Sequence, residues 1–148
     1  MVSVPLDTLS SLPYSRRTWP EPGTSELGPM VIPGRLAPVA DELIRLTGLR
    51  GGWNSYGAAP VRPAVVPTAI LVLLRASWDL PLPSVSPTPR GGVQLEWGDD
   101  DDGVEIEVEP DGSLSVLIDA QGGVDERHLT GPDDPGLLEA LLWAAKLA

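Results

Sequence analysis

Carboxylates spaced two residues apart are the first candidates for chemistry in this sequence. Glu105, Glu107 and Glu109 alternate with apolar residues, and Glu96 precedes them. In an extended strand such alternate side chains share one face and lie about 7 Å apart. Paired carboxylates can act as general acid and base, as in sugar cleavage. That chemistry needs a walled cleft that shifts the pKa of one group, so hydrated glutamates on an open sheet are the favoured interpretation, and no catalytic residue is assigned.

The run of four aspartates at residues 99–102 is a second candidate, because clustered carboxylates suit hard cations. The run lacks the spacing of a calcium loop, with its glycine and its distal bidentate Glu. A hydrated loop whose charges discourage edge association is favoured instead. With no Cys and one His in the chain, Cys-ligated zinc and a multi-histidine site within one chain are excluded. We therefore expect no metal and no cofactor.

His128 could serve as a general base, with Asp125 or Glu126 beside it. No serine stands in a GxSxG elbow, and nothing else marks a nucleophile. An ordinary surface histidine is the favoured interpretation, and we expect the protein not to be an enzyme.

The segment GGWNSYGAAPVRP, residues 51–63, carries Trp53 and Tyr56 between glycines. One hypothesis is an aromatic binding loop. The favoured alternative is that Trp53 fills the gap between a helix and a sheet, since a core with few aromatics usually buries its tryptophans. The GxGxxG and GxxxxGK[ST] spacings are both missing, so it is not a phosphate loop.

The element that must position the glutamates is residues 92–119, where apolar and polar residues alternate with period two in three successive runs. The apolar members of the three runs are Val93, Leu95 and Trp97, then Val104, Ile106 and Val108, then Leu114, Val116 and Ile118. A polar loop and a Pro-Asp-Gly turn connect them, which predicts an antiparallel meander with one apolar face to be covered. Leu117 breaks the alternation on the polar face, which indicates that this face is not wholly solvated. Residues 125–129 could supply a fourth, weaker strand.

Helical spacing of apolar residues predicts three helices. The first spans residues 36–47, with Pro38 in its first turn and Gly48 at its end. The second spans residues 63–77, with regular geometry that could begin only near Pro67. The third starts at Asp134-Pro135 and ends at Lys146. Between the second helix and the meander, residues 80–92 hold four prolines, which predicts an extended link at the domain edge in which Val85 pairs briefly.

Together these elements predict an α+β fold: an antiparallel meander of three to four strands with helices packed on one face, in the order α-α-β-β-β-(β)-α. Residues 36–148 form one domain of ordinary size for a 148-residue chain. Residues 1–35 are predicted to be an extended, Pro-rich and partly disordered arm. A flexible tail is favoured, and packing of its apolar residues onto the domain or onto a partner stays open.

The net charge of −11 is unevenly placed, with fifteen acidic residues and one basic residue, Arg127, between residues 96 and 139. Nucleic acid and anionic membranes need a basic footprint, so neither is an expected partner. No run of 18 or more apolar residues and no basic-plus-apolar leader pattern is present, which makes a cytoplasmic location the default.

A family resemblance adds to this interpretation. The segments GGWNSYGAAPVRPAVVPTAILVLL, LPLPSVSPTPRGGVQLEW and VEIEVEPDGSLSVL follow one another between residues 51 and 118. In their motifs, and in the order of those motifs, they resemble a family of small uncharacterised bacterial proteins with a GW[DN]xYGA loop, a PSVSPTPxGGVxLEW link and strand, and a DG hairpin. Asn54 stands where Asp is common in that family, and Arg90 where Asp or Glu is common. The resemblance supports the fold and implies no mechanism.

Three functional hypotheses follow. The first is a non-catalytic binding module of the antitoxin, immunity or inhibitor type, in which the acidic sheet face docks a basic protein surface. Its candidate partner-binding residues are Glu96, Glu105, Glu107, Glu109, Trp53 and Tyr56. The second is a structural or self-assembling module that forms homo-oligomers through strand edges or the arm. The third is a small-ligand domain or enzyme that uses the Trp53 and Tyr56 loop. The first is favoured narrowly.

Overall fold

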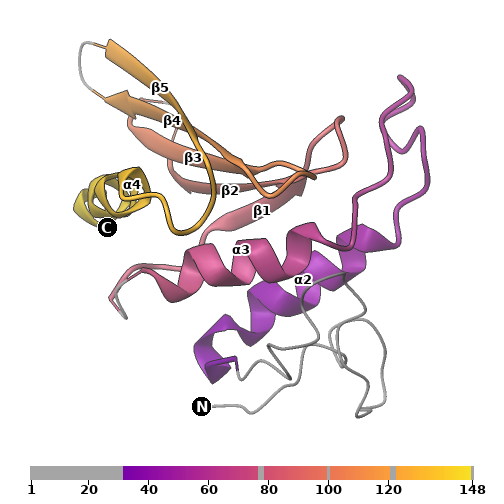
Figure 1. Ribbon diagram of the computed structural model, residues 1–148, viewed down its shortest axis with the longest axis horizontal. Coiled ribbons are helices and arrows are strands. Elements are labelled where there is room, and N and C mark those ends of the chain that lie inside the picture. The colour runs from indigo at the N-terminus through magenta and orange to yellow at the C-terminus, as the bar shows by residue number, and fades with distance from the viewer. Residues whose placement is uncertain (1–31, 77–78, 100, 121–122, 148) are drawn as a thin grey trace.

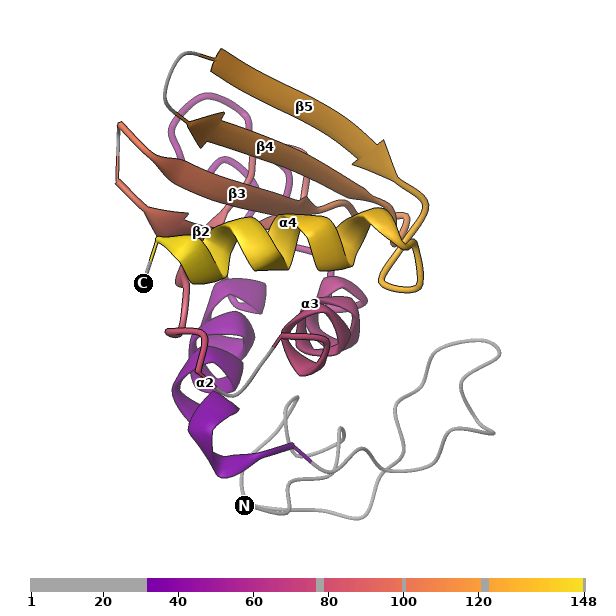
Figure 2. The same ribbon diagram turned by 90° about the vertical axis from the view of Figure 1, so that its left-hand side faces the viewer.

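A five-stranded antiparallel sheet lies against three α-helices in the computed structural model, which describes residues 32–76, 79–99, 101–120 and 123–147. Figures 1 and 2 show the helices gathered on one side of the sheet. The opposite side, which we call the open face, carries no element of the described chain. An α+β fold with an antiparallel sheet is therefore confirmed.

The strands follow one another as a simple meander, each paired with its neighbours in sequence. Their bounds are Ser84–Pro87 for β1, Val93–Gly98 for β2, Gly103–Val108 for β3, Leu114–Ala120 for β4 and Gly123–Leu129 for β5. The helices are α2 (Ala37–Thr47), entered through the short 3-10 turn η1 (Gly34–Leu36), then α3 (Val65–Leu74) and α4 (Gly136–Lys146).

The alternating residues of the meander build the core as predicted. Val104, Ile106 and Val108 are at most 1% exposed, and the apolar members of β2 and β4 are at most 5% exposed. Trp97 also satisfies its one polar atom, because its indole N–H donates to the carbonyl of Pro81 at 2.8 Å. Period-two patterning thus decides which face of the sheet meets the helices.

The two helices before the sheet match their predicted positions with small shifts at the ends. α2 buries Val39, Ala40, Leu43 and Leu46 and contains Pro38 in its first turn. α3 begins at Val65, so Pro67 also falls in a first turn, where a missing N–H costs little. The predicted second helix, residues 63–77, was two residues too long at its start and extended three residues past Leu74, where α3 ends; residue 77 itself lies outside the described residues.

α4 is held by two sets of polar contacts at its start and in its first turn. The Asp134 carboxylate accepts the backbone N–H groups of Gly136 and Thr130, at 2.9 and 3.1 Å. Arg127 of β5 donates to Glu139 of α4 at 2.5 and 3.1 Å, and to Asp125 of its own strand at 2.6 and 2.9 Å. These bonds tie the last strand to the last helix.

The predicted count of three to four strands was too low, because both edge strands carry weak signals. β1 lies in the proline-rich link, where the pairing of Val85 with Leu95 extends from Ser84 to Pro87. Prolines are tolerated there because an edge strand leaves one side unpaired. β5 starts two residues before the predicted fourth strand and is charged on both faces, as suits an edge.

The predicted N-terminal arm falls almost wholly on residues 1–31, which lie outside the described residues. Ile32 is 1% exposed and belongs to the core, and the carbonyl of Pro33 accepts the N–H of Leu36 at 2.9 Å. The packed part of the chain therefore extends at least four residues ahead of the predicted boundary at residue 36.

No helix in the described ranges combines the length and the apolar character needed to cross a lipid bilayer.

Candidate functional site

The open face is polar over most of its area, and strand register determines its composition. Residues paired across neighbouring strands share a face, so one row joins Glu96, Glu105, Leu117 and Glu126. The next row along the strands joins Gln94, Glu107, Ser115 and His128. At the other end, Asp119 stands opposite Val124. A surface of carboxylates with two apolar side chains, Leu117 and Val124, results.

The carboxylates of Glu96 and Glu105 are direct cross-strand partners. Asp119 lies close enough to add its charge to theirs, and the three residues line one small hollow of about 110 Å³. Partial burial raises the pKa of Glu105 above its ordinary value, and the negative charges of Glu96 and Asp119 raise it further. Among the ion pairs of residues 32–76, 79–99, 101–120 and 123–147, none involves these three side chains.

A larger depression of about 460 Å³ follows β4. The central strand contributes the shorter side chains Ser115 and Leu117 to it, and the flanking strands contribute Glu105, Glu107, Glu126 and His128. All of its lining residues belong to β2, β3, β4 and β5. The depression is therefore bounded by one sheet, without the second wall that acid–base chemistry on these glutamates would need.

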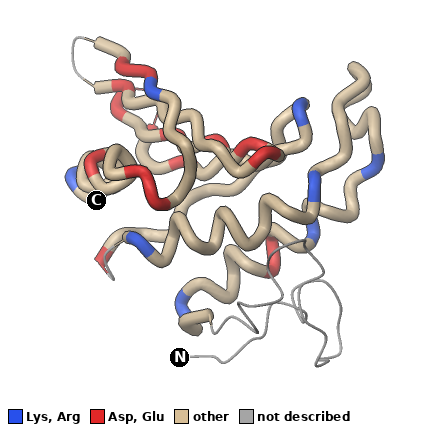
Figure 3. Tube along the Cα trace, viewed as in Figure 1, with Lys and Arg blue, Asp and Glu red and all other residues tan. Residues whose placement is uncertain are grey.

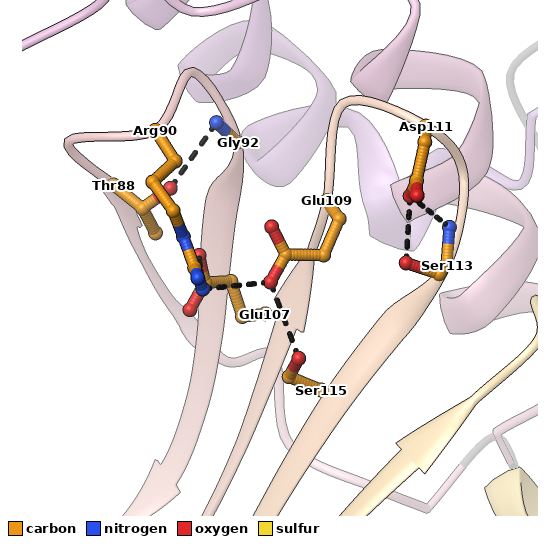
Figure 4. A network of polar contacts seen from close by, with 8 residues as sticks. All are labelled: Thr88, Arg90, Gly92, Glu107, Glu109, Asp111, Ser113 and Ser115. Atoms are coloured by element: carbon orange, nitrogen blue, oxygen red, sulfur yellow. Dashed lines mark hydrogen bonds and ion pairs between the residues drawn. The ribbon is translucent and has the colours of Figure 1, made fainter.

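Arg90 supplies the positive charge at one end of the open face, where Figure 4 shows its contacts. Its guanidinium donates to Glu109 at 2.8 Å and to Glu107 at 3.2 Å, and Glu109 also accepts the hydroxyl of Ser115 at 3.2 Å. The tight connection between β1 and β2 holds Arg90 in place. There Gly92 donates its N–H to the Thr88 hydroxyl at 3.1 Å, and a Cβ at Gly92 would meet the Val108 carbonyl oxygen at 2.2 Å, so only glycine fits.

Charge is thus unevenly spread over the folded molecule as well as along the chain. Figure 3 shows acidic segments gathered on the strands, and basic ones mostly on the helices and on the loops beside them. On the open face, Arg90 reaches Glu107 and Glu109 only. The row of Glu96, Glu105 and Glu126 keeps its negative charge.

The structure brings four of the six predicted partner-binding residues together. Glu96, Glu105 and Glu107 lie on the open face, and Glu109, just past the end of β3, points its carboxylate toward Ser115 and Arg90. Trp53 and Tyr56 lie elsewhere, on the loop between α2 and α3, which Figure 1 shows standing beyond one end of the sheet.

That loop is closed by its own polar groups. The side-chain oxygen of Asn54 accepts the backbone N–H groups of Tyr56 at 2.8 Å and Ala58 at 3.2 Å. The loop is then docked onto the connection between β1 and β2, because Ala59 donates its N–H to the carbonyl of Pro89 at 2.8 Å. A carboxylate at position 54 could accept the same two bonds, so Asn54 serves the backbone of the loop.

The interpretation of Trp53 as a plug between helix and sheet is corrected by this arrangement. Trp53 is half-buried and does not belong to the core cluster or to the side chains packed against it. Its indole N–H donates to the carbonyl of Ala59 at 3.0 Å, within the same loop. Tyr56 is 91% exposed. The core fills the gap with aliphatic side chains, such as Leu43 and Ile70, which need no polar partner.

The aspartate run lies in the loop between β2 and β3, which is held by hydrogen bonds within the loop itself. Asp99 accepts the backbone N–H groups of Asp101 and Asp102, at 2.9 and 3.0 Å, and these bonds hold the pKa of Asp99 below its ordinary value. Asp100 lies outside the described residues. Across the described ranges, no group of three or more Asp, Glu or His side chains is arranged to hold a metal ion.

His128 stands opposite Ser115 on the neighbouring strand. The Ser115 hydroxyl donates to Glu109, on its other side, at 3.2 Å. A nucleophile activated by His128 would require that hydroxyl to donate to the imidazole instead, so the geometry gives this pair no catalytic arrangement.

Two residues of the site were missed at the level of sequence. Arg90 was noted only as a departure from the family pattern; its partners Glu107 and Glu109 lie 17 and 19 residues further along the chain, and only the folded sheet brings them to it. Asp119 ends the third alternating run. The Pro-Asp-Gly turn sets the register in which the third run pairs with the second. That register would have placed Asp119 beside Gly103, and so near Glu105.

Comparison of the chain with protein-family models, with curated proteins and with solved structures gave no significant match.

Proposed function

We propose that the open face is a docking surface for a protein with a basic surface, as in antitoxins, immunity proteins and other inhibitors. The observation that carries the proposal is the cluster of Glu96, Glu105 and Asp119. These like charges are held close together, and no cation of the described residues pairs with them. A lysine or arginine from a partner would relieve their repulsion and gain charge-assisted hydrogen bonds.

The role is proposed as non-catalytic because the glutamates lie on one exposed sheet face. Two apolar side chains among them, Leu117 and Val124, offer a partner apolar contact beside the charges. Val124 is 61% exposed. The likeness to the uncharacterised bacterial family noted above accords with a small binding module and stays part of the proposal.

A matched pair of double variants tests the proposal. Glu105→Gln with Glu126→Gln removes two charges from the open face, and Asp41→Asn with Asp79→Asn removes two exposed charges elsewhere. Basic proteins captured by the immobilised wild-type chain at about 0.05 M salt should be released at about 0.5 M, because screening weakens exposed charge pairs. The first double variant should lose them and the second should keep them. Equal capture by both variants would remove the support for a docking face.

Self-association is the second candidate. Its support is the outer side of β5, which pairs with no strand of the described chain, and the exposed leucines Leu138 and Leu142 of α4. Light scattering decides between the two candidates: a mass that rises with concentration favours an oligomer, and a constant monomer mass counts against it.

A further inference from the structure

An occupant of the open face must satisfy its own backbone hydrogen bonds. The sheet strands already pair with one another through β1 to β5, so their N–H and C=O groups are not offered to a molecule lying on the face. An extended peptide laid there would leave its own polar groups without partners in the protein, whereas an α-helix pairs them internally. The covered face of this sheet is packed by helices for the same reason.

The depression along β4 has room for one row of side chains from a helix that lies over it. Its two walls stand on β3 and β5, two strand spacings apart, which is about 9.6 Å, and a helix with its side chains is about 10–12 Å across. On β4 the depression is lined by Ser115, Val116 and Leu117, which together span about 7 Å, a little more than one helical turn. A helix can therefore lie along β4 with one row of side chains in the depression.

The residues that line the depression indicate which side chains a bound helix would need in that row and on either side of it. Leu117 lies on the central strand, with Glu105 to one side and Glu126 to the other. An apolar side chain on the helix would contact Leu117, and basic side chains on both sides of it would reach the two glutamates. Toward the end of β4 the order differs, because the acidic Asp119 lies on the central strand, with Gly103 to one side and Val124 to the other.

We propose that the partner presents a basic amphipathic α-helix, with an apolar stripe flanked by lysines or arginines, that lies along β4 between Glu105 and Glu126. This inference rests on the proposed function and names the partner's recognition element. It concerns a helix supplied by another protein, bound to the face opposite α2, α3 and α4.

Three labelled peptides of about 18 residues test the inference, each built from the same Lys, Leu and Ala residues. In the first, leucines recur at helical spacing and lysines flank them; in the second, lysine and leucine alternate; in the third, the order is scrambled. Fluorescence anisotropy with the full chain should give the helical peptide about tenfold tighter binding than the other two. Circular dichroism should show that peptide gaining helix when it binds.

The outcomes separate this inference from the function on which it rests. Equal binding of the three peptides, lost at high salt, would overturn the helix and leave a docking face for basic partners. Binding of none of them at low salt would overturn both. Stronger binding of the alternating peptide would also overturn the helix, since it would point to strand addition at an edge such as β5.

A pair of leucine variants locates the binding. Leu117→Thr keeps a residue suited to a strand and removes the apolar contact, and it should abolish the preference for the helical peptide. Leu142→Gln removes a leucine that is 65% exposed on α4, across the sheet, and should leave the preference unchanged. A preference that survives Leu117→Thr would overturn the placement along β4.

Discussion

Glu96 and Glu105 stand directly opposite each other on β2 and β3, with both carboxylates on the open face. Like charges in this cross-strand arrangement destabilise a sheet. Glu107 and Glu109 are treated differently, because Arg90 makes an ion pair with each of them. The fold thus balances part of the charge at one end of the acidic surface and leaves the other end without a counter-ion, which is the feature the proposed partner would use.

Removing one charge of this pair should stabilise the free protein. Glu105→Gln keeps the shape of the side chain and relieves the repulsion from Glu96 and Asp119, so we expect a gain of up to about 0.5 kcal/mol, reduced by solvent screening. Urea unfolding measures it. Glu107→Gln is the control, because it removes a partner of Arg90 and should give no gain. A loss of stability in Glu105→Gln would contradict the account of the cluster.

The same variant should change the pH dependence of stability. The folded-state pKa of Glu105 is raised, so the native chain binds more protons than the unfolded chain between the two pKa values. The contribution of Glu105 to stability therefore falls as pH rises through that window, which begins near the ordinary value of a glutamate. Urea unfolding at about pH 4 and about pH 7 should show the advantage of Glu105→Gln at the higher pH only. An advantage that is constant with pH would exclude charge repulsion as its cause.

The link between the last strand and the last helix should depend on Arg127. Arg127→Met leaves Asp125 and Glu139 without their shared cation, so the unfolding midpoint should fall by more than in Arg45→Met, which removes an exposed pair with Glu42 within α2. The double variant Arg127→Met with Glu139→Gln should recover part of the loss, because it removes one of the two carboxylates left behind. Equal losses for Arg127→Met and Arg45→Met would show that the link adds nothing to an ordinary surface pair.

The loop that carries Tyr56 should tolerate one substitution at Asn54 and not another. Asn54→Asp retains an oxygen that accepts the N–H groups of Tyr56 and Ala58, whereas Asn54→Ala leaves both without that acceptor, at a cost of about 1 kcal/mol. Hydrogen exchange of these two amides should accelerate in the alanine variant and stay slow in the aspartate variant. Fast exchange in both variants would mean that a neutral amide is required.

The alternation of residues 92–119 was sufficient to predict the three central strands and the face each buries. Every second residue there is apolar, and a shift of register by one would expose the whole set. The two edge strands, β1 and β5, could not be predicted as clearly, because their sequences lack this alternation. β5 has no single apolar face, since Asp125 and Arg127 occupy the side that meets α4, where Arg127 donates to both Asp125 and Glu139. Their pairing depends on a helix that comes later in the chain.

The acidic residues of the candidate site were predicted from the sequence. The contacts that they make in the fold were not. Alternation placed Glu105 and Glu107 on one face, but whether each is neutralised depends on Arg90, which only the folded connection between β1 and β2 brings near. Trp53 could not be placed because a tryptophan satisfies its indole N–H either with a distant segment, as Trp97 does with Pro81, or within its own loop. Composition alone does not distinguish these two outcomes.

The most direct measurement of the central claim is a map of backbone amide signals by NMR as an oligolysine of about ten residues is added, long enough at about 3.3 Å per residue to cross the sheet. A docking face for basic partners predicts that the signals of Glu96, Glu105, Leu117 and Glu126 move together and return at high salt. Movement confined to the aspartate loop at residues 99–102, or spread evenly over the helices, would contradict it.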